Sequence, residues 1–151
     1  LCAAFPERHP DAESREKDWE FLAQKLEAGA CAAITQCFFE PLPYLELVDW
    51  LTRRLGRTPR IIPGILPVTD FRAVERFCAR CGASIPPRMR AALEPFADDR
   101  IAVRRAGMEW TVRLCESLLA AGAPGLHLYA LNRSTAVAEL VAVLRRSGYL
   151  R

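Results

Sequence analysis

The sequence predicts an α/β fold of parallel strands that alternate with helices, and three observations lead to that prediction. Short apolar segments alternate with longer ones whose apolar residues recur at helical spacing. The first three apolar segments start at residues 1, 31 and 60, and a step of about 30 residues suits an eight-unit barrel of roughly 250 residues. The runs 32–39 and 61–66 are apolar on both faces, as buried parallel strands tend to be. Half of a barrel is therefore preferred, and a doubly wound sheet is the alternative.

The first half of the chain is expected to contain three strand–helix units. Strands are expected at residues 1–5, 31–39 and 60–66. A helix follows each strand, because apolar residues recur there at helical spacing between recognisable start and stop residues. These start and stop residues are Ser14 and Gly29, Pro43 and Gly56, and Asp70 and Gly82.

The second half is expected to hold a fourth, longer unit. A short helix runs from Pro86 and Pro87 to Phe96, and a long helix follows from residue 98 or 99 to residue 119. The fourth strand is expected at residues 125–131, and Ser134 caps a last helix that stops before Gly148. No linker divides the chain, so residues 1–151 are predicted to be a single partial domain.

Composition and charge exclude several classes of protein. The 151 residues are 51% hydrophobic and 26% charged, which excludes a disordered chain. A net charge of +3, spread along the chain, gives no footprint for nucleic acid. The uncharged stretch 28–39 is too short to span a bilayer, and no signal peptide is visible, so no membrane partner is expected. Six cysteines, mostly in apolar surroundings, favour a reducing, cytoplasmic location over a disulfide scaffold.

Ligands of parallel α/β folds bind beyond the carboxyl ends of the strands, so polar residues there are the candidate site. The most specific of them is Gln36, a primary amide within the apolar segment 31–39 that must find hydrogen-bond partners. Its donor and acceptor suit a flat heterocycle with an amide or amidine edge. The alternative is a core glutamine satisfied by backbone groups, which periodicity alone favours.

Other candidate residues also have plain structural alternatives. His9 stands in a loop before a helix, where backbone N–H groups and a cation such as Lys25 can hold a phosphate. Arg133 follows the fourth strand, where arginines often clamp carboxylates. An ordinary loop histidine, a solvated lysine and a loop-capping arginine explain the same residues. Phe77 fits the apolar stripe of its helix, so core packing is its default role.

Two cysteines, Cys78 and Cys81, have the spacing of a redox or zinc motif. A second pair of ligands at suitable spacing is missing, and the motif lies late in its helix rather than at the N-terminus, where thiolates are stabilised. Neither a metal site nor redox chemistry is expected from this motif.

Four segments together resemble one family. Residues 5–12, Phe-Pro-Glu-Arg-His-Pro-Asp-Ala, resemble the Tyr-Pro-Glu-Gly-His-Pro-Glu-Ala loop of methylenetetrahydrofolate reductases. Residues 28–40 contain Ala-Gly-Ala and then Ile-Thr-Gln-Cys-Phe-Phe-Glu, similar to that family's Ile-Thr-Gln-(Phe/Leu)-Phe-Phe-(Asp/Glu) strand. Residues 61–67, Ile-Ile-Pro-Gly-Ile-Leu-Pro, and 126–133, Leu-His-Leu-Tyr-Ala-Leu-Asn-Arg, complete the resemblance in order and spacing.

The resemblance implies the C-terminal half of a (β/α)8 TIM barrel in a flavoprotein oxidoreductase. Such an enzyme takes a hydride from NADH or NADPH onto FAD and reduces 5,10-methylenetetrahydrofolate to 5-methyltetrahydrofolate. The residues that would bind FAD are His9, Ala12, Asp18 and Lys25. Gln36 would hydrogen-bond the pterin, Phe77 would pack against folate or nicotinamide, and Arg133 would lie near the folate tail.

The chain departs from the family pattern within the flavin-binding segments. Phe5 replaces a tyrosine whose hydroxyl could touch the flavin, and Arg8 replaces a loop glycine. Phe21 and Gln24 stand where some members place polar or basic contacts to FAD. These departures concern FAD affinity more than the fold.

The family's catalytic glutamic acid belongs to the N-terminal half of the barrel, before Leu1. We therefore expect residues 1–151 to be inactive alone and to pair with that missing half, and a homo-oligomer is compatible with the sequence. Two alternatives stay open. One is a non-catalytic half-barrel that only binds a partner chain, and the other is a folate-binding or regulatory module that has lost flavin.

Overall fold

The computed structural model describes residues 1–131 and 134–150, and within them four strands form one parallel sheet. The strands are β1 (Cys2–Ala4), β2 (Ala33–Cys37), β3 (Ile61–Ile65) and β4 (His127–Leu128), in the order β1-β2-β3-β4. All three neighbouring pairs are parallel. The predicted α/β class is confirmed, and sequential parallel strands joined by helices are consistent with part of a TIM barrel.

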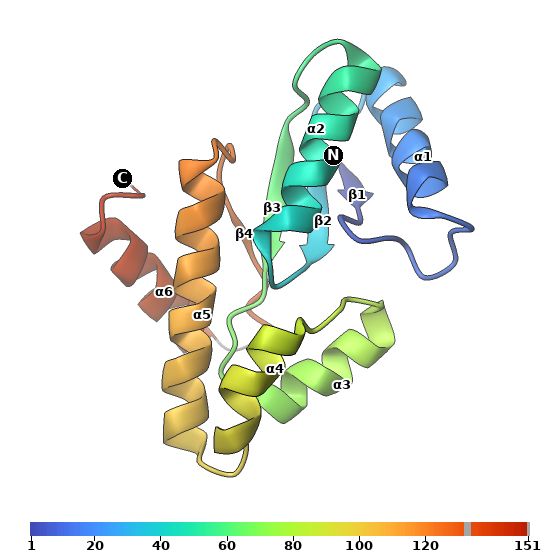
Figure 1. Cartoon of the computed structure of the whole chain (residues 1–151). Helices are drawn as coiled ribbons and strands as arrows, with labels where there is room; N and C mark the ends of the chain where they lie inside the picture. Colours follow the sequence, from blue (N-terminus) through green and yellow to red (C-terminus); the bar gives the residue numbers. More distant parts are fainter. Residues whose placement is uncertain (132–133, 151) are drawn as a thin grey trace.

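Four helices cover one face of this sheet (Figure 1). They are α1 (Arg15–Glu27), α2 (Pro41–Leu55), α5 (Arg100–Ala120) and α6 (Ser134–Arg146). Their buried side chains form one apolar cluster with Ala33, Ile61 and Ile65 of the strands. Helices α1, α2 and α5 belong to the crossovers between parallel strands, so they lie on the same side of the curved sheet, and α6, which follows β4, packs with them.

Side-chain caps fix where the helices begin. The Ser14 hydroxyl accepts a hydrogen bond from the Lys17 N–H at the start of α1. Asp99 accepts the Ile101 and Ala102 N–H groups at the start of α5. Each cap satisfies N–H groups that the first turn of a helix leaves without a partner.

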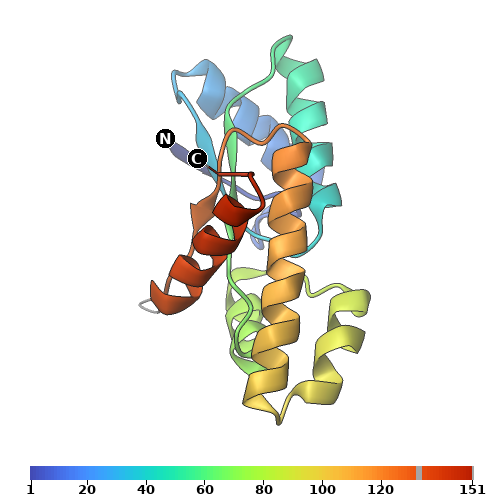
Figure 2. The same cartoon turned by 90° about the vertical axis from the view of Figure 1, so that its left-hand side faces the viewer.

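A second helical group lies beyond the carboxyl ends of the strands (Figures 1 and 2). It comprises α3 (Phe71–Cys81), α4 (Pro87–Leu93) and the 3-10 helix η1 (Glu94–Phe96). Its apolar residues, among them Met89 and Leu93, form a separate cluster with Val68 and Val103. The β3–β4 connection therefore makes an excursion through α3, α4 and η1 before α5 returns along the sheet.

The structure differs from the sequence-based expectation in the extent of some elements. The fourth strand was expected over residues 125–131, but only His127–Leu128 are paired as β4. Gly125 and Leu131, with φ of 152° and 44°, leave the extended conformation on either side. The expected helix at 86–96 is divided into α4 and η1, where Pro95 lacks the N–H that would continue the helix. Among residues 1–131 and 134–150, no helix combines the length and apolar character needed to cross a membrane.

Candidate functional site

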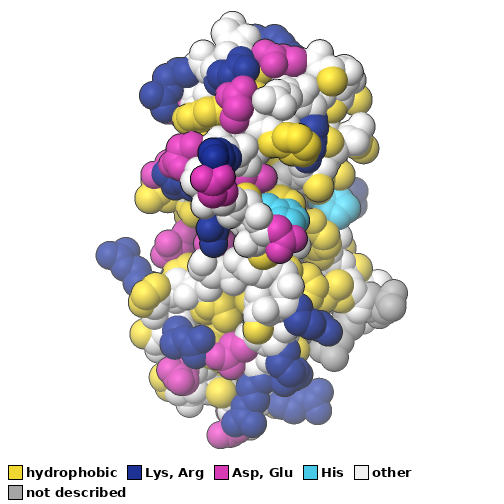
Figure 3. Space-filling model, turned by 90° about the vertical axis from the view of Figure 1, so that its right-hand side faces the viewer, with side chains coloured by type: hydrophobic (Ala, Val, Ile, Leu, Met, Phe, Trp, Pro, Cys, Tyr) yellow, Lys and Arg dark blue, Asp and Glu magenta, His cyan; other side chains and the backbone are white. Residues whose placement is uncertain are grey.

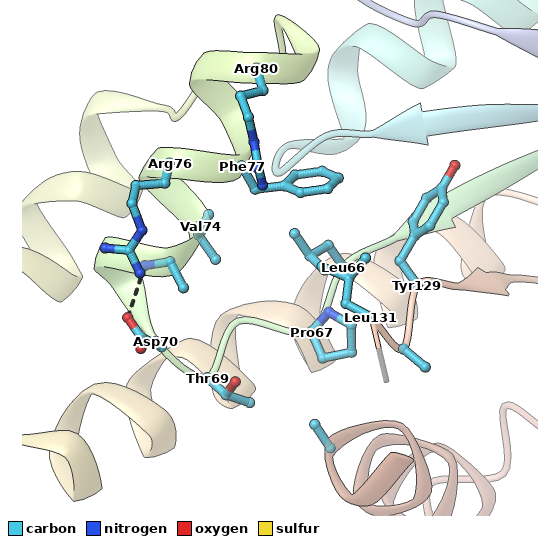
Figure 4. A pocket seen from close by; sticks show the side chains of 13 residues that line it. Leu66, Pro67, Thr69, Asp70, Val74, Arg76, Phe77, Arg80, Tyr129 and Leu131 are labelled. Atoms are coloured by element: carbon cyan, nitrogen blue, oxygen red, sulfur yellow. Dashed lines mark hydrogen bonds between the residues drawn. The ribbon is translucent and has the colours of Figure 1, made fainter. Parts of the chain in front are cut away.

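A cavity of about 260 Å³ lies beyond the carboxyl ends of β3 and β4 (Figure 4). Phe77 points into it from α3, and Leu66 and Tyr129 line it from the segments that follow the two strands. Arg76 and Arg80 of α3 also line the cavity. The cavity thus combines apolar and aromatic walls with two cationic groups, which suits a flat ring that carries an anionic group.

The strand next to this cavity contains an irregularity around Thr35. The register between β2 and β3 shifts between Ile34 and Cys37. The Gly64 N–H donates to the Thr35 hydroxyl at 2.8 Å, and the Tyr129 hydroxyl donates to the Thr35 carbonyl at 2.9 Å. These two bonds satisfy backbone groups that a regular ladder would have paired. Burial raises the pKa of Tyr129, so its hydroxyl stays protonated and can donate.

Gly64 is required for this arrangement. A Cβ atom at this position would lie 2.1 Å from the Thr35 carbonyl oxygen and 2.6 Å from the Tyr129 ring. The absence of a side chain lets the tyrosine ring lie over the strand and reach Thr35.

Gln36 follows directly after Thr35 and is half-buried. Its Oε1 accepts a hydrogen bond from the Cys37 N–H at 2.9 Å. A backbone partner for Gln36 was the plain alternative expected from the sequence, and the structure supplies it for the oxygen. With its oxygen engaged, the side chain can offer a ligand the donors of its amide nitrogen. The structure therefore suits a ligand with an acceptor, such as a ring carbonyl, at this position.

The loop that contains His9 is held by its own hydrogen bonds. The His9 N–H donates to the Asp18 carboxylate at 2.8 Å, and the Ala12 N–H donates to the His9 carbonyl at 3.0 Å. The Asp11 N–H donates to Nδ1 of His9 at 3.1 Å. Because Nδ1 accepts, the neutral ring carries its proton on Nε2, which can act as a donor. These backbone N–H groups already have partners, so a phosphate would have to bind to side chains here.

Asp18 and Lys25 lie along one side of α1. Seven residues separate them, which corresponds to about 10 Å along the helix axis. The Lys25 ammonium lies 4.8 Å from the centre of the Phe21 ring, which is 58% exposed between them. His9, Ala12 and Asp18 are therefore brought together, and Lys25 lies about two turns further along the same helix.

Arg133 and Asn132 lie outside the described residues. The structure places residues on either side of them, Leu131 and Ala136, in the lining of the Phe77 cavity. Figure 3, which views the molecule from the side of α1 and α3, shows basic side chains gathered toward its lower end. The three arginines of α3, Arg72, Arg76 and Arg80, are exposed.

Sequence reasoning missed Tyr129, Arg76 and Arg80. The signal for the two arginines was available, because positions 76, 77 and 80 share one face of a helix and Phe77 was already a candidate. The role of Tyr129 depends on a contact with residue 35 across β3, which the spacing of apolar residues does not reveal. Within residues 1–131 and 134–150, no group of three His, Cys, Asp or Glu side chains is arranged to hold a metal ion.

Comparison with known proteins places the chain in a family. A family model described as methylenetetrahydrofolate reductase matches residues 1–145. The chain belongs to the methylenetetrahydrofolate reductase family. Similar relatives include 5,10-methylenetetrahydrofolate reductase of Escherichia coli, which is 36% identical over 132 residues, 87% of this chain and 44% of the relative. The probable NADPH-dependent reductase of Caenorhabditis elegans is 37% identical over 144 residues, 95% of this chain and 22% of the relative.

The reductase family includes relatives named for either nicotinamide. The probable NADH-dependent reductase of Oryza sativa is 37% identical over 139 residues, 86% of this chain and 23% of the relative. This chain therefore spans less than half the length of these relatives.

A solved structure supports the fold of this reductase family member. A protein from Clostridium thermocellum, described as binding two copies of 5-methyl-5,6,7,8-tetrahydrofolic acid, superposes with a TM-score of 0.58 at 18% identity. The match covers 97% of this chain and 52% of that one.

Proposed function

We propose that residues 1–151 are the C-terminal half of the catalytic barrel of a methylenetetrahydrofolate reductase. The complete enzyme would reduce 5,10-methylenetetrahydrofolate to 5-methyltetrahydrofolate with NADH or NADPH through FAD. The observation that carries the proposal is the cavity lined by Phe77 and Tyr129, because the Tyr129 hydroxyl bonds to Thr35, the residue before Gln36. Gln36 itself lines a separate cavity of about 10 Å³. All six cysteines are free thiols, which supports a cytoplasmic location for the enzyme.

The cavity is proposed to hold the folate and, in the other half-reaction, the nicotinamide. Phe77 is half-buried, so its ring can stack on a flat heterocycle without leaving the apolar cluster that supports it. Gln36 would donate from its amide nitrogen to the pterin. Arg76 and Arg80, together with Arg133, would supply positive charge for the carboxylates of the folate tail.

The side of α1 that carries Asp18 and Lys25 is proposed to bind FAD. FAD, when bound, would carry the hydride between the nicotinamide and the folate. His9 would donate from Nε2, and the second oxygen of the Asp18 carboxylate would accept from a hydroxyl group. Lys25 would pair with a phosphate, and Ala12 would border the cofactor with its backbone. The side chains of His9, Asp18 and Lys25, rather than backbone N–H groups, would thus bind the polar part of the dinucleotide.

The acid that protonates the substrate is proposed to come from the N-terminal half of the barrel. That half would pair with the two outer strands of the sheet, β1 and β4, each of which has one parallel neighbour in the described structure. Residues 1–151 alone are therefore expected to be inactive, because they would contribute binding and orientation without this proton donor.

Absorption spectra of the full-length protein test the proposal. We expect a bound flavin whose absorbance is bleached by NADH or NADPH and restored by methylenetetrahydrofolate. Phe77→Ala should weaken folate binding at least about tenfold, since one aromatic stack contributes roughly 0.5–1.5 kcal/mol beyond its buried area. Phe96→Ala is the matched control, because Phe96 is 44% exposed on η1 and outside the cavity. Equal folate affinity for the two variants would contradict the proposed site.

A second candidate function is a folate-binding module without flavin. It is favoured by the His9 loop, whose backbone N–H groups at residues 9, 11 and 12 already have protein partners. A colourless full-length protein that binds folate, and whose affinity depends on Phe77, would favour this candidate over the reductase.

A further inference from the structure

Three thiols from two separate elements gather at the carboxyl end of β2. Cys37 is the last residue of β2, and Cys78 and Cys81 lie in the last turn of α3. Cys37 and Cys78 are buried in the apolar cluster beyond the strands, and Cys81 packs against that cluster. Cys37 and Cys81 also line one cavity of about 10 Å³, which is too small for an organic ligand. The structure thus brings to the Cys78–Cys81 motif a third thiol that is distant in the sequence.

The three thiols differ in their access to solvent. Burial, reinforced by the thiols of Cys81 and Cys78, raises the pKa of Cys37, and Cys37 and Cys81 face the same small cavity. Burial likewise raises the pKa of Cys78 to about 12. Cys81 is only partly buried. Because peroxide reaches an accessible thiol more readily than a buried one, Cys81 is the thiol of the three that is placed to react first.

We propose that Cys81 and Cys37 form a peroxide-sensitive pair that closes to a disulfide. In the first step the Cys81 thiolate attacks hydrogen peroxide: a sulfur–oxygen bond forms, the oxygen–oxygen bond breaks, and the departing hydroxide takes up a proton as water. In the second step the Cys37 sulfur attacks the sulfenic acid of Cys81. The sulfur–sulfur bond forms, and the hydroxide leaves as water with the Cys37 proton. Two thiols and one hydrogen peroxide thus give one disulfide and two water molecules.

Cys37 is a better partner for Cys81 than Cys78 is. Cys78 and Cys81 belong to the same turn of α3, where both Cα–Cβ bonds tilt toward the helix N-terminus and do not point at one another. Cys81 is the last residue of α3, and Gly82 follows it with φ of 76°, so its backbone is limited by the helix on one side only. Its side chain can therefore turn toward β2.

The disulfide would join two elements of the candidate site. Gln36 precedes Cys37 and accepts its N–H, and Phe77 lies on the same helix as Cys81. The cross-link would hold the strand that carries Gln36 against the helix that carries Phe77. This pair is independent of flavin and of catalysis, so it can be tested separately from the proposed function.

Peptide mapping of the full-length protein with Cys31→Ser tests the proposal. Cys31 is exposed and shares a tryptic peptide with Cys37, whereas Arg80 separates Cys78 from Cys81. The protein is treated with hydrogen peroxide, its remaining thiols are alkylated, and it is digested without reduction. We expect the peptide that contains Cys37 to be linked to the peptide that begins at Cys81, and dithiothreitol to reverse the link.

Two further variants, in the same background, control this result. Cys78→Ser should keep the link, and Cys37→Ala should lose it and leave Cys81 as a sulfenic acid that dimedone labels. A link between Cys78 and Cys81 would overturn the proposal. So would a Cys81 that stays fully alkylatable at a peroxide concentration that oxidises Cys31 of the parent protein. Circular dichroism verifies that each variant is folded. If a variant does not fold, the presence or absence of the Cys37–Cys81 link in the Cys31→Ser protein still tests the proposal.

Discussion

The hydroxyl of Tyr129 donates a hydrogen bond to the carbonyl oxygen of Thr35, 94 residues earlier in the chain, at 2.9 Å. This bond crosses β3 and ties the segment after β4 to the irregular part of β2. Because Gln36 follows Thr35, the position of Gln36 depends on an aromatic side chain that also lines the cavity. Several consequences of this arrangement can be measured.

Replacing Tyr129 by phenylalanine keeps the ring and removes the donor. The Thr35 carbonyl then loses a partner, so we expect the free energy of unfolding to fall by about 1–2 kcal/mol and folate affinity to fall as Gln36 loses its fixed position. Urea denaturation and folate titration of the full-length protein measure the two effects. Tyr149→Phe, at a side chain that is 40% exposed, should change neither. Unchanged folate affinity in Tyr129→Phe would show that the Tyr129–Thr35 hydrogen bond does not contribute to the folate site.

Replacing Gly64 by alanine should disturb the Tyr129–Thr35 contact through a steric clash. The new Cβ would meet the Thr35 carbonyl oxygen at 2.1 Å and the Tyr129 ring at 2.6 Å, and we expect a loss of about 3 kcal/mol in the free energy of unfolding. Gly29→Ala separates crowding from backbone strain, because Gly29 has φ of 109° and open space around it. Strain alone should cost about 1–2 kcal/mol there. An equal loss in the free energy of unfolding for Gly64→Ala and Gly29→Ala would contradict a steric clash at Gly64.

Thr111 connects α5 to the segment after β3. Its hydroxyl accepts the Val68 N–H at 3.1 Å and donates to the Gly107 carbonyl at 2.8 Å, and all three groups are buried. Thr111→Val should therefore lower the free energy of unfolding by about 1–3 kcal/mol, because the Val68 N–H is left without a partner. Thr52→Val is the matched control, since the Thr52 hydroxyl only donates to a carbonyl of its own helix. Thermal or urea unfolding of the two variants gives the comparison.

Alkaline solution should destabilise the fold. Burial raises the pKa of Cys115 from 9.0 to about 12 and the pKa of Tyr44 from 10.0 to about 12. The folded state therefore keeps protons that the unfolded state releases, and stability is complete below about pH 9 and is lost as the pH rises toward 12. One such group contributes at most about 1.4 kcal/mol per pH unit. Cys115→Ala should make the decline between pH 9 and 10 shallower, whereas Cys31→Ala, at an exposed thiol, should leave it unchanged.

The order of helices and strands could be predicted from the sequence because it depends on local patterns, such as helix caps and terminal glycines. Ser14 and Asp70, for example, are caps at the expected positions, and each accepts a backbone N–H of its helix. Gly56 and Gly82 end their helices with the positive φ that glycine tolerates. Strand ends were less predictable, as β4 shows, because pairing depends on the neighbouring strand.

The candidate site was predictable only where a motif carries it. Gln36 and Phe77 could be named from the sequence, but the contact of Tyr129 with Thr35 and the shared cavity of Cys37 and Cys81 depend on how distant segments pack. The spacing of Cys78 and Cys81 on α3 predicted no site, and Cys37, the other thiol of the proposed pair, comes from the strand β2. These are tertiary contacts, so no local sequence pattern predicts them.

The apolar residues of α3 and α4 form their own interior, separate from the one behind the sheet. A substitution on the α3 side of the cavity therefore acts on a cluster that is separate from the one behind the sheet. Tyr129, by contrast, lines the cavity and is bonded to β2, so a change there affects ligand binding and stability together. The α3 side is consequently the part of the cavity wall where ligand preference can change with the least effect on the strands.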